Sequence, residues 1–166
     1  MAEETWAIIR AAVGPYELTP GKGAELAEKV YFRHFRPMEL FIAKEFVRKE
    51  YIHGTYYFDV YLFTEEIWDW LKKMPEQYWR MAIPYAHRID CVIITEDKIY
   101  LVEFKIRLKY SAIGQLMGYL DWFKRQYRPT KPVVPLVVYA LDRPELHETC
   151  DRLGIKRLKI TAVSYT

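Results

Sequence analysis

The sequence contains no asparagine and only three glutamines among its 166 residues. Side-chain amides are labile at high temperature, and proteins from thermophiles tend to contain few of them. The composition therefore favours a thermophilic source.

Cysteine is equally scarce, with only Cys91 and Cys150 in the chain. Two cysteines are too few for a cysteine-only zinc or iron–sulfur site, and a chain of this length does not need a disulfide for stability. We expect two reduced thiols, with Cys91 in the run IDCVII acting as a small buried hydrophobic residue.

The sequence has no apolar run long enough to span a bilayer. The first residues, MAEETWAIIRAA, carry two glutamates where a signal peptide would carry positive charge. These absences predict a soluble, intracellular, cytoplasmic protein that does not bind membranes.

Charge of one sign is not in large excess, because 25 basic and 22 acidic residues give a net charge of +3. Net charge alone is thus weak evidence for a polyanionic partner. Hydrophobic residues make up 51% and charged residues 28%, which is a globular balance. The length predicts a single domain over residues 1–166.

The first predicted helix lies near the N-terminus. Thr19-Pro20 supplies a cap and a first-turn proline ahead of a helix predicted over Gly23–Phe35, which Pro37 ends. We assign residues 1–77 to an N-terminal elaboration of helices and strands.

Residues 38–63 are open to two interpretations. MELFIAKEFVRKEYI has the spacing of an amphipathic helix, whereas His53-Gly54 followed by YYFDVYLF favours a strand hairpin. Strands are favoured. A short helix then runs from Thr64 through IWDWLKKM to Pro75, with acidic residues at its start and lysines at its end, as the helix dipole prefers.

Residues 78–163 have a clearer pattern: a β-meander, a helix, a strand, a helix and a last strand. This order predicts an α/β fold with a mixed β-sheet flanked by helices. The predicted elements are strands over Tyr78–Ile83, Arg88–Thr95 and Ile99–Ile106, a helix from a Ser111 cap to Gln126, a central strand over Val133–Ala140, a helix over Pro144–Leu153 ending at Gly154, and a strand over Ile155–Val163.

Charged residues interrupt the second and third strands of the predicted meander. Two-residue periodicity places Glu103, Lys105 and Arg107 on one face of their strand. The short turn Glu96-Asp97-Lys98 makes the preceding strand an antiparallel neighbour, so Asp90 can reach Glu103.

A pair of carboxylates near the interior of a sheet is costly unless a cation neutralises it. Magnesium, a hard cation that prefers oxygen ligands, fits this need. Such an ion can bind a phosphate and activate a water molecule, and Lys105 can orient that water or balance charge on the phosphate.

These residues resemble the motif of a known superfamily. Asp90, twelve intervening residues and then Glu103-Phe104-Lys105 resemble the motif of the PD-(D/E)XK, or restriction-endonuclease-like, nucleases, although Ile89 stands where the family often has proline. Gln115-Leu116-Met117-Gly118-Tyr119 is similar to the QxxxY element of the RecB-like branch. The resemblance covers residues 78–163 as the catalytic core.

The resemblance implies a restriction-endonuclease-like fold with an elaborated N-terminal region. It also implies a Mg²⁺-dependent deoxyribonuclease, in which Mn²⁺ can substitute, that hydrolyses phosphodiester bonds in DNA with an activated water. Asp90, Glu103 and the backbone carbonyl of Phe104 would hold the metal, and Gln115 and Tyr119 would position Lys105 or the nucleic-acid backbone.

The family often adds an acidic residue from its first helix. Glu25 and Glu28 are the candidates here, and Glu28 is preferred. On the QxxxY helix, Gly114 and Gly118 are expected to allow close approach to the sheet. The expected core stripe of that helix is Ile113, Leu116, Leu120, Phe123 and Tyr127.

Basic residues flank the predicted site and are either a phosphate track or an ordinary solvated surface. They are Lys105, Arg107, Lys109, Lys124, Arg125, Arg128 and Lys131. Aromatic residues over 51–63, with Trp68 and Trp70, would either stack on single-stranded nucleic acid or belong to the core or a subunit interface. A homodimer would suit an enzyme that cuts two strands.

Two alternatives to a nuclease remain. A catalytically inactive protein of the same fold would bind nucleic acid or a protein partner, and RNA is as open to it as DNA. If the fold interpretation fails, Glu103 and Lys105 merely pair on the surface of an α/β protein. The motifs do not distinguish endonuclease from exonuclease action.

Overall fold

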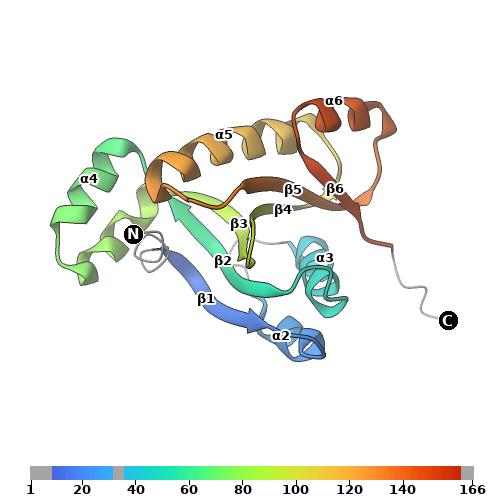
Figure 1. Ribbon diagram of the computed structural model, residues 1–166, viewed down its shortest axis with the longest axis horizontal. Coiled ribbons are helices and arrows are strands. Elements are labelled where there is room, and N and C mark those ends of the chain that lie inside the picture. The colour runs from blue at the N-terminus through green and yellow to red at the C-terminus, as the bar shows by residue number, and fades with distance from the viewer. Residues whose placement is uncertain (1–8, 32–35, 162–166) are drawn as a thin grey trace.

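The computed structural model describes residues 9–31 and 36–161, which form one six-stranded mixed sheet between two layers of helices (Figure 1). The strands lie in chain order; neighbours are antiparallel from β1 to β4 and parallel from β4 to β6. They are β1 (Ala11–Leu18), β2 (Gly54–Leu62), β3 (His87–Ile94), β4 (Ile99–Arg107), β5 (Val133–Leu141) and β6 (Lys156–Lys159).

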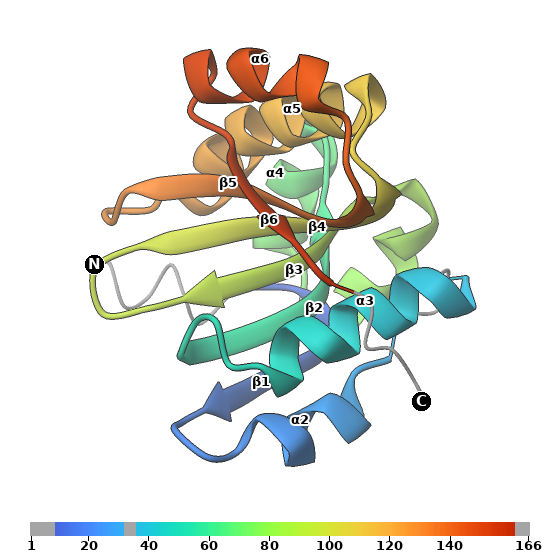
Figure 2. The same ribbon diagram turned by 90° about the vertical axis from the view of Figure 1, so that its right-hand side faces the viewer.

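Within the described residues, α2 (Gly23–Lys29) and α3 (Pro37–Arg48) cover one face of the sheet (Figure 2). On the side of the second face lie α4 (Glu65–Lys73), α5 (Tyr110–Tyr127) and α6 (His147–Arg152), with the 3₁₀ segments η1 (Glu76–Tyr85) and η2 (Pro144–Leu146). The predicted α/β architecture with a mixed, helix-flanked sheet is confirmed.

Helix α5 crosses the second face from the β5 side to the β2 side. Its first half packs Ala112 and Leu116 against Val137 of β5. Its second half packs Phe123 and Tyr127 in a different cluster that includes Val60 of β2. One helix therefore covers both halves of this face.

The last turn of α5 is tied to β2 by hydrogen bonds as well as by packing. The Gln126 side-chain oxygen accepts from the Phe63 amide at 2.7 Å, and its amide group donates to the Tyr61 carbonyl at 3.1 Å. The Tyr127 hydroxyl donates to the same carbonyl at 2.9 Å. These bonds fix the end of α5 over the sheet.

The strand interpretation of residues 38–63 is wrong for its first half. Pro37 does not end a helix but begins α3, because a proline at the first helical position loses no intrahelical hydrogen bond. Ile42, Ala43, Phe46 and Val47 have helical spacing and form one buried helical face, whereas the strand signal of YYFDVYLF belongs to β2 alone. The first helix ends earlier than predicted, at Lys29, and residues 32–35 lie outside the described part.

The first predicted strand of the meander, Tyr78–Ile83, is also wrong. This segment lies within η1, and the first strand of the meander is β2. Ser111 does not cap α5, which begins one residue earlier after Lys109 without a side-chain cap. The last strand is shorter than predicted and covers Lys156–Lys159; residues 162 and 163 lie outside the described part.

The alternation of side chains along β2 is interrupted at Asp59, which has a φ of 57°. Phe58 packs beneath α2 and α3, whereas Val60 packs in the cluster beneath α5. In a regular strand, residues i and i+2 face the same side of the sheet. The left-handed residue between Phe58 and Val60 therefore switches the side that the following side chains face.

Within the described residues, no helix combines the length and apolar character needed to cross a membrane.

The expected close approach of Gly114 and Gly118 to the sheet is wrong. A Cβ built on either glycine would meet no atom within 4 Å, and both positions are exposed. The helix therefore contacts the sheet through its other face.

Gly114→Ala and Gly118→Ala should each stabilise the protein by about 0.5–1 kcal/mol, because alanine is the better helix former and nothing opposes its methyl group. Thermal unfolding measures this. Gly54→Ala is the contrasting variant: its Cβ would lie 2.5 Å from the Ile94 carbonyl oxygen at a φ of 156°, so it should lower the melting temperature. A destabilised Gly114→Ala would contradict the placement of α5.

Candidate functional site

The candidate site lies where β3 and β4 stop pairing. Their ladder runs from Ile94 opposite Ile99 to Cys91 opposite Val102 and goes no further within the described strands. The next opposing residues would be Asp90 and Glu103. Strand β4 continues to pair with β5 as far as Arg107, and β3 continues to pair with β2 as far as His87, so the sheet parts between β3 and β4.

Beyond the end of the ladder, each carboxylate accepts a hydrogen bond from a backbone amide of the opposite strand. The Phe104 amide donates to Asp90 Oδ2 at 2.9 Å, and the Asp90 amide donates to Glu103 Oε1 at 3.2 Å. Each acidic side chain thus bonds to the opposite strand, and the structure brings together the two residues that the sequence pairs.

Burial changes the acidity of both groups. Glu103 is only 3% exposed, and desolvation raises its pKa to about 7, although Lys105 and hydrogen bonds from Asp90 act in the opposite direction. Desolvation, followed by the negative charge of Glu103, raises the pKa of Asp90 well above its usual range. Without a cation the pair therefore tends to hold a proton near neutral pH.

Lys105 places a cation beside the pair. Its Nζ lies 4.0 Å from Glu103 Oε2, and its side chain is 17% exposed. At this distance it lowers the pKa of Glu103 without forming a close ion pair. Its ammonium group can therefore donate to a further acceptor at the edge of the site.

A third acidic residue, Asp59, occupies the neighbouring strand. In the β2–β3 register it stands opposite Asp90, between the pairs Phe58–Cys91 and Val60–Ile89. It is 6% exposed, and its charge is one of the effects that raise the pKa of Glu103. Asp59, Asp90 and Glu103 thus occupy one row across β2, β3 and β4.

Asp59 is not among the site residues predicted from the sequence, where it lies in the hydrophobic run YYFDVYLF. A lone carboxylate in such a run was the available signal, because ionisable residues are rarely fully buried without a partner.

Few side chains at the site could bind a divalent cation. Among the described residues, no group of three or more His, Cys, Asp or Glu side chains is arranged to hold a metal. Asp90 and Glu103 supply the carboxylate oxygens of the predicted motif, and Phe104, between Glu103 and Lys105 on β4, has the backbone carbonyl that the motif assigns to the metal. Magnesium usually binds through one or two protein carboxylates and keeps its other positions for water and substrate. The residues fit such an ion.

Helix α5 contributes one wall of the site. Tyr119 is half-buried, and desolvation raises its pKa to about 12, with further contributions from the charges of Glu103 and Asp90. Arg88 acts in the opposite direction. Arg88 precedes Asp90 by two positions on β3 and is a second cation near the site that the sequence analysis left without a role. Gln115 lies one turn before Tyr119 and is exposed.

The structure does not bring Glu28 to the carboxylate pair. Glu28 is exposed on α2, which packs with α3 and β1 on the other face of the sheet. Asp90, Glu103 and Tyr119 belong to the α5 side. The preferred acidic residue from the first helix therefore stands apart from the site, as does Glu25 on the same helix.

The predicted phosphate track is divided between the two ends of α5. Arg107 and Lys109 lie before its first turn, whereas Lys124, Arg125 and Arg128 lie in or after its last turn. A rise of 1.5 Å per residue separates Lys109 from Lys124 by roughly 22 Å. Tyr119 lies between these two basic groups, so the structure has two patches flanking the site.

Comparison with protein-family models, with curated proteins and with solved structures finds no match.

The raised pKa of Glu103 predicts how stability depends on pH in the metal-free protein. The folded protein keeps the Glu103 proton between its usual pKa of 4.5 and about 7. The stabilising contribution is therefore complete below the lower value and is lost as the pH rises through the upper one. In EDTA, the melting temperature of the wild type should fall relative to that of Glu103→Gln as the pH is raised from about 5.5 to about 8. An unchanged difference would contradict the buried, coupled pair.

Proposed function

We propose that this protein is a metal-dependent nuclease that hydrolyses phosphodiester bonds in DNA with water as the nucleophile. The observation that carries the proposal is the buried Asp90–Glu103 pair at the point where β3 and β4 part, with Lys105 beside it. The family resemblance of the same residues supports it, as does the presence of a meander, helix and strand in the predicted order.

The carboxylate pair is difficult to explain by stability alone. Each acid replaces a backbone bond that an ordinary ladder would make without any charge. Burying two acids side by side costs free energy whether they ionise against each other or hold protons. A hard divalent cation bound by both would offset that cost, and this favours a binding role.

Asp90, Glu103 and the Phe104 carbonyl would hold this cation. When bound, it would supply Lewis acidity, which withdraws charge from the scissile phosphate and makes water a better nucleophile. Asp90 and Glu103 keep their orientation through the bonds to the Phe104 and Asp90 amides.

Lys105 and Tyr119 can then act on the substrate. The Lys105 ammonium lies at the exposed side of the pair, where it can donate to a phosphate oxygen or orient the attacking water. Tyr119 remains a neutral phenol at working pH because its pKa is raised to about 12. Its hydroxyl can donate to the phosphate backbone, while Arg88 adds positive charge on the same side.

A non-catalytic protein of the same fold is the second candidate. One observation favours it: the described residues provide no three-residue metal cluster, and hydrogen bonds to backbone amides already satisfy both carboxylates in part. Such a protein would bind nucleic acid or a protein partner over the same surface and would not hydrolyse it. Its binding would not require a metal.

A cleavage assay separates the two candidates. With Mg²⁺ or Mn²⁺, wild-type protein should degrade single- or double-stranded DNA, and RNA serves as a parallel substrate. Asp90→Asn, Glu103→Gln and Lys105→Met should each reduce the rate at least about a hundredfold, because each removes charge from the reacting centre. Activity that is equal in all three variants would identify a contaminant and sink the proposal.

Glu28→Gln is the matched control, since α2 lies on the other face of the sheet. It should retain wild-type activity.

Metal binding can be measured without catalysis. Mn²⁺ titration followed by electron paramagnetic resonance should reveal a site that Glu103→Gln and Asp90→Asn both weaken and that Mg²⁺ competes for. Binding should strengthen as the pH rises through about 7, because the cation must displace the Glu103 proton. Nucleic-acid binding with no Mn²⁺ signal would favour the non-catalytic candidate.

A further inference from the structure

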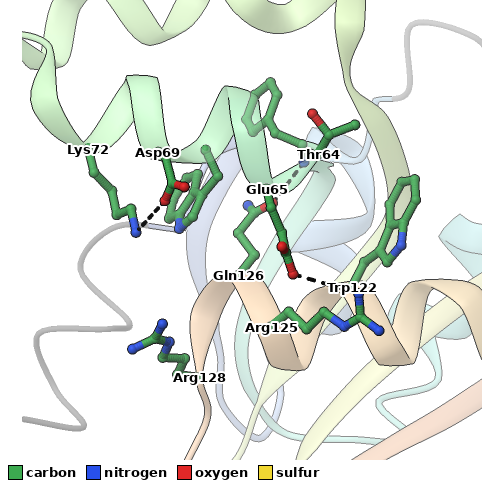
Figure 3. Close-up of a pocket in the computed structure, with 10 residues that line it drawn as sticks. Thr64, Glu65, Asp69, Lys72, Trp122, Arg125, Gln126 and Arg128 are labelled. Carbon is green, nitrogen blue, oxygen red and sulfur yellow. Dashed lines mark hydrogen bonds and ion pairs between the residues drawn. The ribbon is translucent and has the colours of Figure 1, made fainter.

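A pocket of about 480 Å³ lies between α4 and the second half of α5 (Figure 3). Its volume is within the roughly 300–1,000 Å³ range of small-molecule sites. Its lining combines aromatic side chains with three basic ones, Lys72, Arg125 and Arg128. Arg125 and Arg128 belong to the predicted phosphate track, but the catalytic roles proposed above do not use this pocket.

The aromatic walls of the pocket are held in fixed positions. The rings of Trp68 and Phe63 stack with centroids 6.4 Å apart, and Tyr127 packs edge-on against Trp68 at 5.6 Å. On the other side, Trp122 packs against His87 with ring centroids 4.6 Å apart. Trp68 and Phe63 are only 7% and 3% exposed, so they reach the pocket with a small part of their surface, and their fixed rings lose little conformational entropy when a planar ligand binds.

The basic residues at the pocket differ in how they are paired. Arg125 contacts Asp121 at 3.0 Å and Glu65 at 3.6 Å, and Lys72 contacts Asp69 at 3.0 Å. Arg128 has no ion-pair partner among the described residues. Its guanidinium extends from the end of α5 towards Lys72 on α4 (Figure 3). An anionic group at the mouth of the pocket would form an ion pair with Arg128.

The pocket continues the surface of the candidate site. Gln115, Tyr119 and Trp122 are four and then three residues apart, so they share one face of α5. Trp122 stands one turn beyond Tyr119, and its partner His87 precedes Asp90 by three positions on β3. A strand held at the carboxylate pair can thus extend along α5 to the pocket.

We infer that this pocket binds one unpaired nucleotide of the nucleic-acid strand, with its base between the Trp68 and Trp122 walls and a phosphate at Arg128. The inference rests on the proposed function and names its substrate class: a strand that is single, frayed or locally unpaired next to the cleaved bond. A base held in a duplex must first leave its stack to enter.

Binding of fluorescein-labelled oligo(dT), about twelve residues long, in EDTA tests the inference without cleavage. Trp122→Ala and Arg128→Gly should each weaken binding about tenfold, the size of a lost base–aromatic or phosphate contact. Arg128→Gly should fold at least as stably as the wild type, because Arg128 has a φ of 46°, which glycine adopts without strain. Normal affinity in both folded variants would overturn the inference.

Two control variants match these changes. Trp70→Ala removes a tryptophan from the same helix α4 that is 66% exposed and outside the pocket. Lys156→Ala removes one positive charge from β6. Both should bind oligo(dT) within about twofold of the wild type, and a tenfold loss in either would show that general charge or hydrophobicity sets the affinity.

The source of the nucleotide is tested with dTMP and with oligo(dT) that carries one abasic position. A strand-bound nucleotide predicts weak competition by dTMP and a tenfold loss from the abasic change at a single position. Competition by dTMP at the concentration of the oligonucleotide would instead assign the pocket to a free nucleotide and overturn the strand assignment.

The failure of one proposal can be distinguished from that of the other. Normal binding by Trp122→Ala and Arg128→Gly, with cleavage lost in Asp90→Asn, would reject the nucleotide pocket and support the nuclease. Weakened binding in both pocket variants, without cleavage by any preparation, would reject the nuclease function and support the nucleotide pocket.

Discussion

The separation of β3 from β4 at Asp90 and Glu103 is the constraint on which the candidate site depends. An uninterrupted ladder would consume the Phe104 and Asp90 amides in backbone bonds. Here these amides bond to carboxylates instead. The two acids are therefore oriented by the main chain of opposite strands, which is more rigid than any pairing between flexible side chains. Their raised pKa values follow from the same burial.

Helix α5 determines what can reach this pair. Gln126 and Tyr127 hold its end on β2, while Ala112 and Leu116 hold its beginning over β5. Fixed at both ends, the helix presents Tyr119 to the carboxylates and Trp122 to the pocket beyond them. The site and the pocket are consequently two parts of one surface, and basic residues lie near both ends of the helix.

The neighbouring strand β2 departs from regular geometry beside the same pair. Asp59 has a left-handed conformation and reverses which side of the sheet the chain packs against. Aspartate tolerates this conformation better than most residues. The irregularity and the parting of β3 from β4 occupy one row across the sheet, so the regular pairing weakens on both sides of Asp90.

Local sequence was sufficient where one pattern excluded the others. The alternation in IYLVEFKIRLK placed Glu103 and Lys105 on one face, and the short turn before it paired them with Asp90, because both signals act within a few residues. The secondary structure of residues 38–63 was not determined in this way, because helical spacing and strand signals follow each other closely there. The apolar residues of α3 have helical spacing, but the strand signal of the neighbouring YYFDVYLF extended over them in the prediction, and their burial against Phe104 and the sheet shows the helix.

By itself, the sequence determined the α/β class, the β3–β4 hairpin, the helix after it and the pairing of two acids, since hydrophobic periodicity and turn length act locally. Tertiary structure alone decided that Asp59 joins their row, that Glu28 lies on the far face, and that Trp68 and Trp122 line one pocket. Those residues meet across the sheet or between helices, and a linear pattern does not encode which layer of the fold each one enters.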